Sequence, residues 1–394
     1  MRRIEKENPD FFPEGVSMVQ PLSPEQLLEA LNRQLTYVRA NSPFYREHLP
    51  DTELTSLDRL STLPFVTARD LSEDGQRMLC CLPKEIRRMV TMRTSGTTGK
   101  PKRLAFSQRD LRDTVSFFRD GMRLLCKRGD TVMIFMPGSR PDGLCRLLAE
   151  GIEAFGGIPV IYGVILDYQA AARVCRDRQA AVMVGVPAQI RRLALTAPDL
   201  RPVRVLLSAD YLSSALAGSI ERIWRCQVLN HYGLTESGLG CAVETPERRG
   251  MLVRRDIYLE ALPEGELALT TLRRQAMPLI RYRTGDLGRM LPDGRLGEIF
   301  GRKADLAPDA CQSFGCGISV PLLDQILFAE DTVLDYQALR GTKGLQIKVA
   351  GGEAAKQAAC DALDRAGFGI SVRVTADEGV CSDGISKRRM IDQV

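Results

Sequence analysis

The chain has few of the residues on which several common kinds of active site depend. It contains two histidines, His48 and His231, so a mechanism built on a histidine base has few candidates. Its 11 cysteines are scattered without the spacing of metal ligands, and reduced thiols in a cytosol explain them best. We therefore predict no zinc site, and we expect catalysis by charge and positioning.

Long apolar runs and strong charge asymmetry are absent as well. No apolar stretch approaches the ~20 residues that a membrane-spanning helix needs. Residues 1–15 carry charges without the apolar segment of a secretory signal. The 54 Lys and Arg and the 49 Asp and Glu leave a net charge of +5 that is spread along the chain. We therefore expect a cytoplasmic protein whose partners are neither nucleic acid nor membrane.

Hydrophobic periodicity predicts an α/β fold. A helix is expected over residues 22–39, because Ser23 and Gln26 have the spacing of a capping box. From Thr131 to Asn230, short apolar runs alternate with helical patterns, which predicts a parallel sheet with helices on both faces. The predicted strands are Thr131–Met136, Ile158–Tyr162, Ala181–Gly185, Val203–Leu207 and Gln227–Asn230.

After Gly250 the pattern becomes β-rich, with turn signals between short apolar runs. The strands expected there are Ile257–Leu262, Glu266–Leu272 and Pro278–Tyr282. We predict a large N-terminal domain over residues 1–300, with parallel sheets, covering helices and a small β-rich subdomain. A small, mobile α+β domain is expected over residues 301–394. Its expected elements are Leu345–Val349, Ala354–Ala366 and Ile370–Val374.

The sharpest local signal is the run from Thr94 to Lys102. Small hydroxyl residues and two glycines let backbone N–H groups and side-chain hydroxyls surround phosphate oxygens, and Lys100 adds positive charge. The spacing differs from that of a Walker loop, and Pro101 follows the lysine. The predicted phosphate-binding residues are Thr94, Ser95, Gly96, Thr97, Thr98, Gly99 and Lys100.

This loop resembles the phosphate loop of the adenylate-forming superfamily, which comprises acyl-CoA ligases, luciferases and the adenylation domains of peptide synthetases. Three further motifs follow in the order typical of that superfamily. Tyr-Gly-Leu-Thr-Glu (232–236) resembles its adenine and magnesium motif, and Tyr-Arg-Thr-Gly-Asp (282–286) resembles its ribose motif. Gly-Arg-Lys-Ala-Asp (301–305) resembles the start of its mobile carboxyl-terminal domain. Four ordered motifs are more specific than any one of them.

Within the superfamily, the chain resembles the phenylacetate-CoA ligase and coenzyme F390 synthetase branch. The likeness rests on residues 41–46, 63–65 and 69–71 near the amino terminus and on residues 266–272 and 276–284. A homodimer is common in this branch. The resemblance therefore implies an ATP-dependent ligase that forms an acyl-adenylate and then a thioester.

The resemblance also implies roles for individual residues. Glu236 would hold Mg²⁺, Thr235 would hydrogen-bond the α-phosphate, and Tyr232 would stack on adenine. The other implied ATP-binding residues are Ser208, Ala209 and Asp210 beside the base, His231 and Gly233 in the pocket wall, Asp286 on the ribose hydroxyls and Arg302 on the ribose.

The carboxyl-terminal region departs from the family pattern. Counting back from Ile391 places Ser386 where the family has its adenylating lysine. We expect Lys387, one position later, to take that role, and the alternative is a solvated basic end. Asp305 is the expected hinge, although the segment that follows it is atypical.

The expected activity is that of an AMP-forming acid:CoA ligase with ATP, Mg²⁺ and coenzyme A as its cofactors and co-substrates. An aryl or arylacetic acid is favoured by the resemblance, whereas Glu150 hints at a more polar acid. Two alternatives stay open. The acyl-adenylate could pass to a carrier-protein thiol, an amine or a deazaflavin, or the chain could be a nucleotide-binding paralogue with impaired catalysis.

Overall fold

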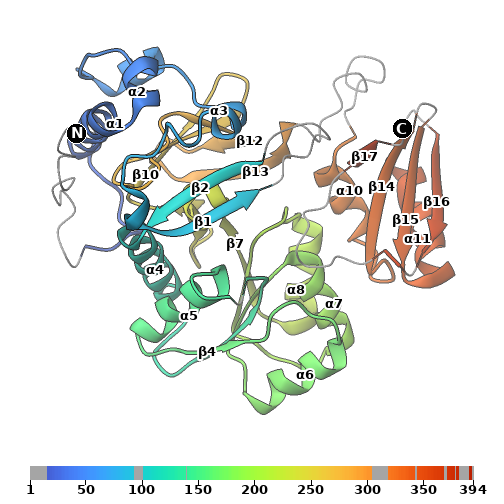
Figure 1. Ribbon diagram of the computed structural model, residues 1–394. Coiled ribbons are helices and arrows are strands. Elements are labelled where there is room, and N and C mark those ends of the chain that lie inside the picture. Colours follow the sequence, from blue (N-terminus) through green and yellow to red (C-terminus); the bar gives the residue numbers. More distant parts are fainter. Residues whose placement is uncertain are drawn as a thin grey trace. The chain divides into compact units, whose positions relative to one another are not determined.

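The computed structural model describes residues 16–92, 101–138, 140–303, 318–341, 344–367, 371–377, 379–380 and 390–392. The chain divides into two compact units. The first unit comprises Met1–Leu124, Tyr232–Thr245 and Arg249–Glu298, and the second comprises Leu125–His231, Pro246–Arg248 and Ile299–Val394. Figure 1 shows the elements of both units.

Side-chain caps begin the helices of the first unit. Ser23 and Gln26 form the predicted capping box of α1 (Pro24–Asn41), which buries Leu31, Leu35 and Val38. Hydroxyl caps also precede α2 (Pro43–His48), α3 (Ala68–Glu73) and α4 (Gln108–Arg123). Two short 3₁₀ helices are η1 (Leu57–Thr62) and η2 (Pro83–Glu85).

No helix among the described residues is long and apolar enough to cross a membrane.

The strands of the first unit form two sheets. β1 (Ile86–Met92) and β2 (Lys102–Ser107) make an antiparallel pair. The larger sheet has the order β10-β11-β12-β13-β9-β8. Its strands are β8 (Ala242–Glu244), β9 (Met251–Val253), β10 (Ile257–Ala261), β11 (Glu266–Thr271), β12 (Tyr282–Met290) and β13 (Leu296–Arg302), of which β13 continues past Glu298, the last residue of the first unit.

The strand predicted at Pro278–Tyr282 is wrong. Arg281 adopts a left-handed conformation with φ 49°, and the strand β12 begins only at Tyr282. Side-chain hydroxyls, and not backbone carbonyl groups, accept from the N–H groups of this segment. Thr271 Oγ1 accepts from the backbone N–H of Leu279, and Thr270 Oγ1 accepts from that of Arg281. Tertiary contacts therefore override the apolar pattern of these residues.

A parallel sheet organises the first part of the second unit, as the sequence predicts. Its order is β7-β6-β5-β3-β4, and every pair in it is parallel. The strands are β3 (Thr131–Phe135), β4 (Ile158–Ile161), β5 (Val182–Gly185), β6 (Arg204–Leu207) and β7 (Gln227–Tyr232). The helices are α5 (Leu144–Ala154), α6 (Tyr168–Asp177), α7 (Pro187–Thr196) and α8 (Ser214–Trp224). The fully buried Trp224 indole donates to the carbonyl of Ala197 at 2.9 Å.

The last part of the second unit is a small α+β module. Its sheet has the order β16-β15-β14-β17, in which β14 and β15 are antiparallel and the outer strands are parallel to their neighbours. The elements are α10 (Val320–Leu327), β14 (Asp335–Gly341), β15 (Gly344–Ala350), α11 (Gly352–Ala366), β16 (Val372–Ala376) and β17 (Met390–Asp392). The structure confirms the three elements predicted here, whereas the division of the chain at residue 300 and the mobility of the module stay predictions.

A buried arginine joins α7 to the small module within the second unit. The Arg191 guanidinium is fully buried and donates to the carbonyl oxygens of Val333 at 2.6 Å and Glu330 at 2.9 Å. It also lies 5.1 Å from the ring centre of Phe328. Arginine suits this position because its planar group presents several donors at once.

Replacing Arg191 by leucine should therefore destabilise the protein. Arg191→Leu leaves the two carbonyl oxygens without these donors, and we expect a loss of about 3 kcal/mol in the free energy of unfolding. Urea unfolding monitored by circular dichroism would measure it. Arg192→Leu is the matched control, because Arg192 is on the same helix, is only half-buried and stacks on Tyr168. Equal losses in the two variants would contradict the prediction.

Candidate active site

Glu236 is a buried acidic residue of the first unit. It lies in η3 (Thr235–Ser237), a 3₁₀ turn that follows β7, and its side chain is 6% exposed. Lys102 Nζ and the Tyr282 hydroxyl donate to its Oε1 at 2.8 Å and 2.9 Å. Burial would raise the pKa of Glu236, but the Lys102 ammonium and the Tyr282 hydroxyl bring it below its ordinary value. The carboxylate is therefore held in its charged form.

Lys102 is a candidate site residue that was not predicted from the sequence, because the positive charge of this segment was assigned to Lys100. The structure pairs Lys102, the last residue of the glycine- and threonine-rich run, with Glu236. Strand alternation was the available signal. Side chains of β2 point to opposite faces in turn, so Lys102 and its neighbours Pro101 and Arg103 face different sides.

Tyr232 and Asp286 also meet, although 54 positions separate them. The Tyr232 hydroxyl donates to Asp286 Oδ2 at 2.8 Å, and both side chains are buried. Burial, followed by the Asp286 charge, raises the pKa of Tyr232 well above its ordinary value, so the phenol keeps its proton. Both residues belong to motifs that are predicted to bind the nucleotide, and β7 and β12 bring their side chains together.

The other predicted residues that the structure describes lie in the second unit or on the turn. Ser208 Oγ and His231 Nδ1 are 2.7 Å apart, and burial lowers the pKa of His231 to about 4. Ala209 has φ 72°, and Asp210 Oδ1 accepts from the N–H of Tyr211. Gly233 and Thr235 are half-buried beside Glu236, and Arg302 ends β13.

Several predicted residues lie outside the described residues. These are Thr94, Ser95, Gly96, Thr97, Thr98, Gly99, Lys100, Asp305 and Lys387. Their assignments stay predictions.

The donor set fits Mg²⁺ only as a site completed by a substrate. Among the described residues, no group of three or more His, Cys, Asp or Glu side chains could hold a metal ion by itself. Mg²⁺ is commonly bound by one or two carboxylates together with substrate phosphates. Glu236 supplies one such carboxylate, so the residues present fit an ion that arrives with a nucleotide.

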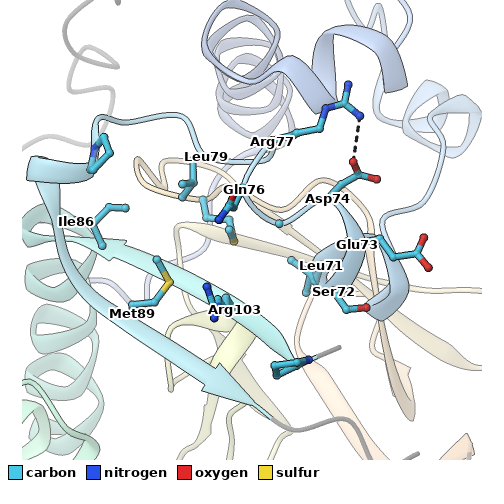
Figure 2. A pocket seen from close by; sticks show the side chains of 14 residues that line it. Leu71, Ser72, Glu73, Asp74, Gln76, Arg77, Leu79, Ile86, Met89 and Arg103 are labelled. Carbon is cyan, nitrogen blue, oxygen red and sulfur yellow. Dashed lines mark hydrogen bonds and ion pairs between the residues drawn. The ribbon is translucent and has the colours of Figure 1, made fainter. Parts of the chain in front are cut away.

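A cavity of about 960 Å³ lies on the other side of β2 from Lys102. Figure 2 shows Leu71, Ile86 and Met89 on its apolar walls, with Arg103 reaching toward it from β2. Pro101 and Arg103 line the cavity, whereas Glu236 and Asp286 do not. The acidic residues and this cavity are therefore separate features of the first unit.

A comparison with protein families identifies the architecture that carries these residues. The family of AMP-binding enzymes matches residues 21–308, which include all four motifs and end before Lys387. The chain belongs to the AMP-binding enzyme family.

Curated relatives of this AMP-binding enzyme include two phenylacetate-coenzyme A ligases. That of Pseudomonas putida is 29% identical over 316 residues, which cover 71% of this chain and 70% of the relative. That of Thermus thermophilus is 28% identical over 317 residues, with the same coverage of 71% and 70%. The match therefore reaches most of both proteins.

A solved structure extends the likeness to almost the whole chain. The 2-hydroxyisobutyryl-CoA ligase, in complex with 2-HIB-AMP in its postadenylation state, superimposes with a TM-score of 0.79 at 20% identity. The superposition covers 99% of this chain and 95% of the ligase. It establishes the fold of the AMP-binding enzyme, including the α/β class predicted from the sequence.

The buried His231 should make stability depend on pH. The unfolded chain takes up a proton near the ordinary pKa of 6.5, whereas folded His231 does so only near 4. Stability is therefore lost as the pH falls through this window, because the unfolded state binds more protons. When the pH falls from 7 to 5, the free energy of unfolding should decrease by about 2 kcal/mol more in the wild type than in His231→Asn.

Urea unfolding at the two pH values measures this difference. Ser208→Ala is the control, because it removes the hydrogen-bonding partner of His231 but keeps the buried imidazole. It should retain the pH dependence of the wild type. A His231→Asn protein with the wild-type pH dependence would show that this imidazole is not the source.

Proposed function

We propose that this AMP-binding enzyme is an AMP-forming acid:CoA ligase that favours an aryl or arylacetic acid. The observation that carries the proposal is the placement of two buried carboxylates, Glu236 and Asp286, on the ordered motifs of a nucleotide site. The relatives named phenylacetate-coenzyme A ligase support the acid class and CoA as acceptor. A homodimer in the cytoplasm belongs to the same proposal and rests on the resemblance to that branch.

The reaction begins with two anions that repel each other. A carboxylate oxygen of the acid must attack the α-phosphorus of ATP, forming an acyl-adenylate while pyrophosphate leaves. In the second step the CoA sulfur attacks the acyl carbonyl carbon, the thiol proton is lost and AMP leaves. Both steps need cations around the phosphates, because an enzyme stabilises charge by groups fixed in advance.

Among the described residues, we assign some to binding the cation and others to binding the nucleotide. Glu236 would hold Mg²⁺, which supplies Lewis-acid neutralisation of phosphate charge when bound. Lys102 Nζ donates to the Glu236 carboxylate, so its ammonium group adds positive charge at the same position. Asp286, held by Tyr232, would accept the ribose hydroxyls, and Thr235 would bond the α-phosphate.

Lys387 remains our proposal for the adenylating lysine. Its position is one residue beyond Ser386, which cannot supply a charge. The small module that carries it would rotate about Asp305 between the two half-reactions, because one cleft must serve two different attacks. A paralogue with impaired catalysis is the alternative that Ser386 favours.

Release of AMP should require an acid and rise on addition of CoA. Glu236→Gln keeps the side-chain volume but removes the charge, so acid-dependent ATP–pyrophosphate exchange should fall by about 10² or more.

An exchange screen over aromatic, aliphatic and amino acids would identify the acid. Exchange without any stimulation of AMP release by CoA would favour another acceptor, and no exchange with any acid would favour the impaired paralogue.

Lys387→Ala should slow the two half-reactions unequally. Adenylation should fall by about 10², the usual effect of losing one charge-stabilising donor. Transfer to CoA from preformed acyl-AMP should keep its rate. Arg389→Ala, which removes a neighbouring charge, is the matched control and should leave both rates unchanged. Equal losses in both half-reactions would count against the assignment of Lys387.

A further inference from the structure

Buried side chains hold the turn at residues 235–238, which carries Glu236, by donating to its backbone carbonyl groups. Arg274 Nη1 donates to the carbonyl oxygen of Glu236 at 2.5 Å, and Arg254 Nη1 donates to that of Ser237 at 3.4 Å. The hydroxyl of Thr114 donates to the carbonyl oxygen of Gly238 at 3.0 Å. Three successive carbonyl groups of the turn therefore have partners from outside it.

Gly238 shows how closely the turn packs on these partners. Its φ of 83° is in the left-handed region, where glycine is favoured. A Cβ atom at this position would lie 3.0 Å from Arg274 Nη2, 3.3 Å from Thr114 Oγ1 and 3.4 Å from Arg254 Nη1. The backbone of the turn thus rests directly on the two guanidinium groups.

The guanidinium of Arg254 is itself fixed. Its Nε and Nη2 donate to the two carboxylate oxygens of Asp256 at 2.6 Å and 2.8 Å. Its Nη1 also reaches the carbonyl oxygen of Gly240 at 3.5 Å. Arg254 is 2% exposed, so these contacts operate without competition from water.

Arg274 is fixed through its backbone and its ring contact. Gln34 Nε2 donates to the carbonyl oxygen of Arg274 at 3.0 Å, and the guanidinium lies 5.2 Å from the ring centre of Phe106. The Asp110 carboxylate at the start of α4 accepts from the next two backbone N–H groups, those of Gln275 at 2.8 Å and Ala276 at 3.1 Å. The segment that carries Arg274 therefore has little freedom to shift.

We propose that Arg274 and Arg254 are positioning residues that fix the Glu236 carboxylate for nucleotide-bound Mg²⁺. They act through the turn and touch no substrate. The inference rests on the proposed function, because it takes Glu236 as the magnesium ligand. A buried guanidinium group suits this role, since it presents several donors in one plane and remains charged.

The test is the gain in ATP affinity that Mg²⁺ confers. Isothermal titration calorimetry would measure the Kd of ATP with Mg²⁺ and again with excess EDTA, for the wild type and for Arg274→Met. The variant should lose about tenfold or more of the magnesium-dependent gain, because the turn loses a buried hydrogen bond from a charged donor. Its Kd in EDTA and its KM for the acid should change much less. Arg274→Lys should recover part of the gain.

Arg255→Met is the matched control. Arg255 follows Arg254 in the chain and is also buried, but its guanidinium donates to the carbonyl oxygen of Gln20 at 3.1 Å. The Arg255→Met protein should be less stable than the wild type but should keep the magnesium-dependent gain in ATP affinity. If Arg274→Met does not fold, Thr114→Val removes only the hydroxyl that bonds Gly238 and should reduce the gain in the same direction.

The outcomes separate the two proposals. A wild type that does not bind ATP would overturn the proposed function. This inference alone would be overturned by a different result. In that case the wild type gains ATP affinity with Mg²⁺, and folded Arg274→Met, Arg274→Lys and Thr114→Val proteins gain as much. Equal weakening of ATP binding with and without Mg²⁺ would also overturn it, because a purely structural role has that effect.

Discussion

The Glu236 carboxylate is charged in a place from which water is nearly excluded. An unpaired charge there would cost several kcal/mol, so the fold must supply partners for it. Lys102 and Tyr282 provide them from β2 and β12, strands far apart in the sequence. The position of β2 against the turn is therefore a condition for keeping this carboxylate ionised, and an ionised carboxylate is what a metal-nucleotide complex needs.

A second layer of charge surrounds this pair in the first unit. Arg254 pairs with Asp256, and Arg273 Nε lies 3.1 Å from Asp113 Oδ2. Burial, together with the Asp256 charge, raises the pKa of Asp113 to about 7. The guanidinium groups of Arg254 and Arg273 thus each contact a carboxyl group. Such a network is costly to break at one point, because the group left behind is buried without its partner.

Arginine has a recurring structural use in both units. Arg191, Arg274 and Arg281 each donate to backbone carbonyl oxygens that lie outside the strands and α-helices. Irregular backbone that is buried must still satisfy its polar groups. A long side chain with a planar set of donors can do so at a distance, and these three segments of the chain are held in this way.

Local patterns in the sequence determined the α/β class, the parallel strands, the capped first helix and the ordered motifs. Each of these follows from residues close together in the chain, since alternation, periodicity and caps act over a few positions. Tertiary structure decided the rest. The irregular segment before Tyr282 follows from hydroxyl contacts with β11, and Lys102 reaches Glu236 only because folding brings residues 134 positions apart together. The carbonyl contacts of Arg274 and Arg254 likewise depend on distant backbone, which no local pattern encodes.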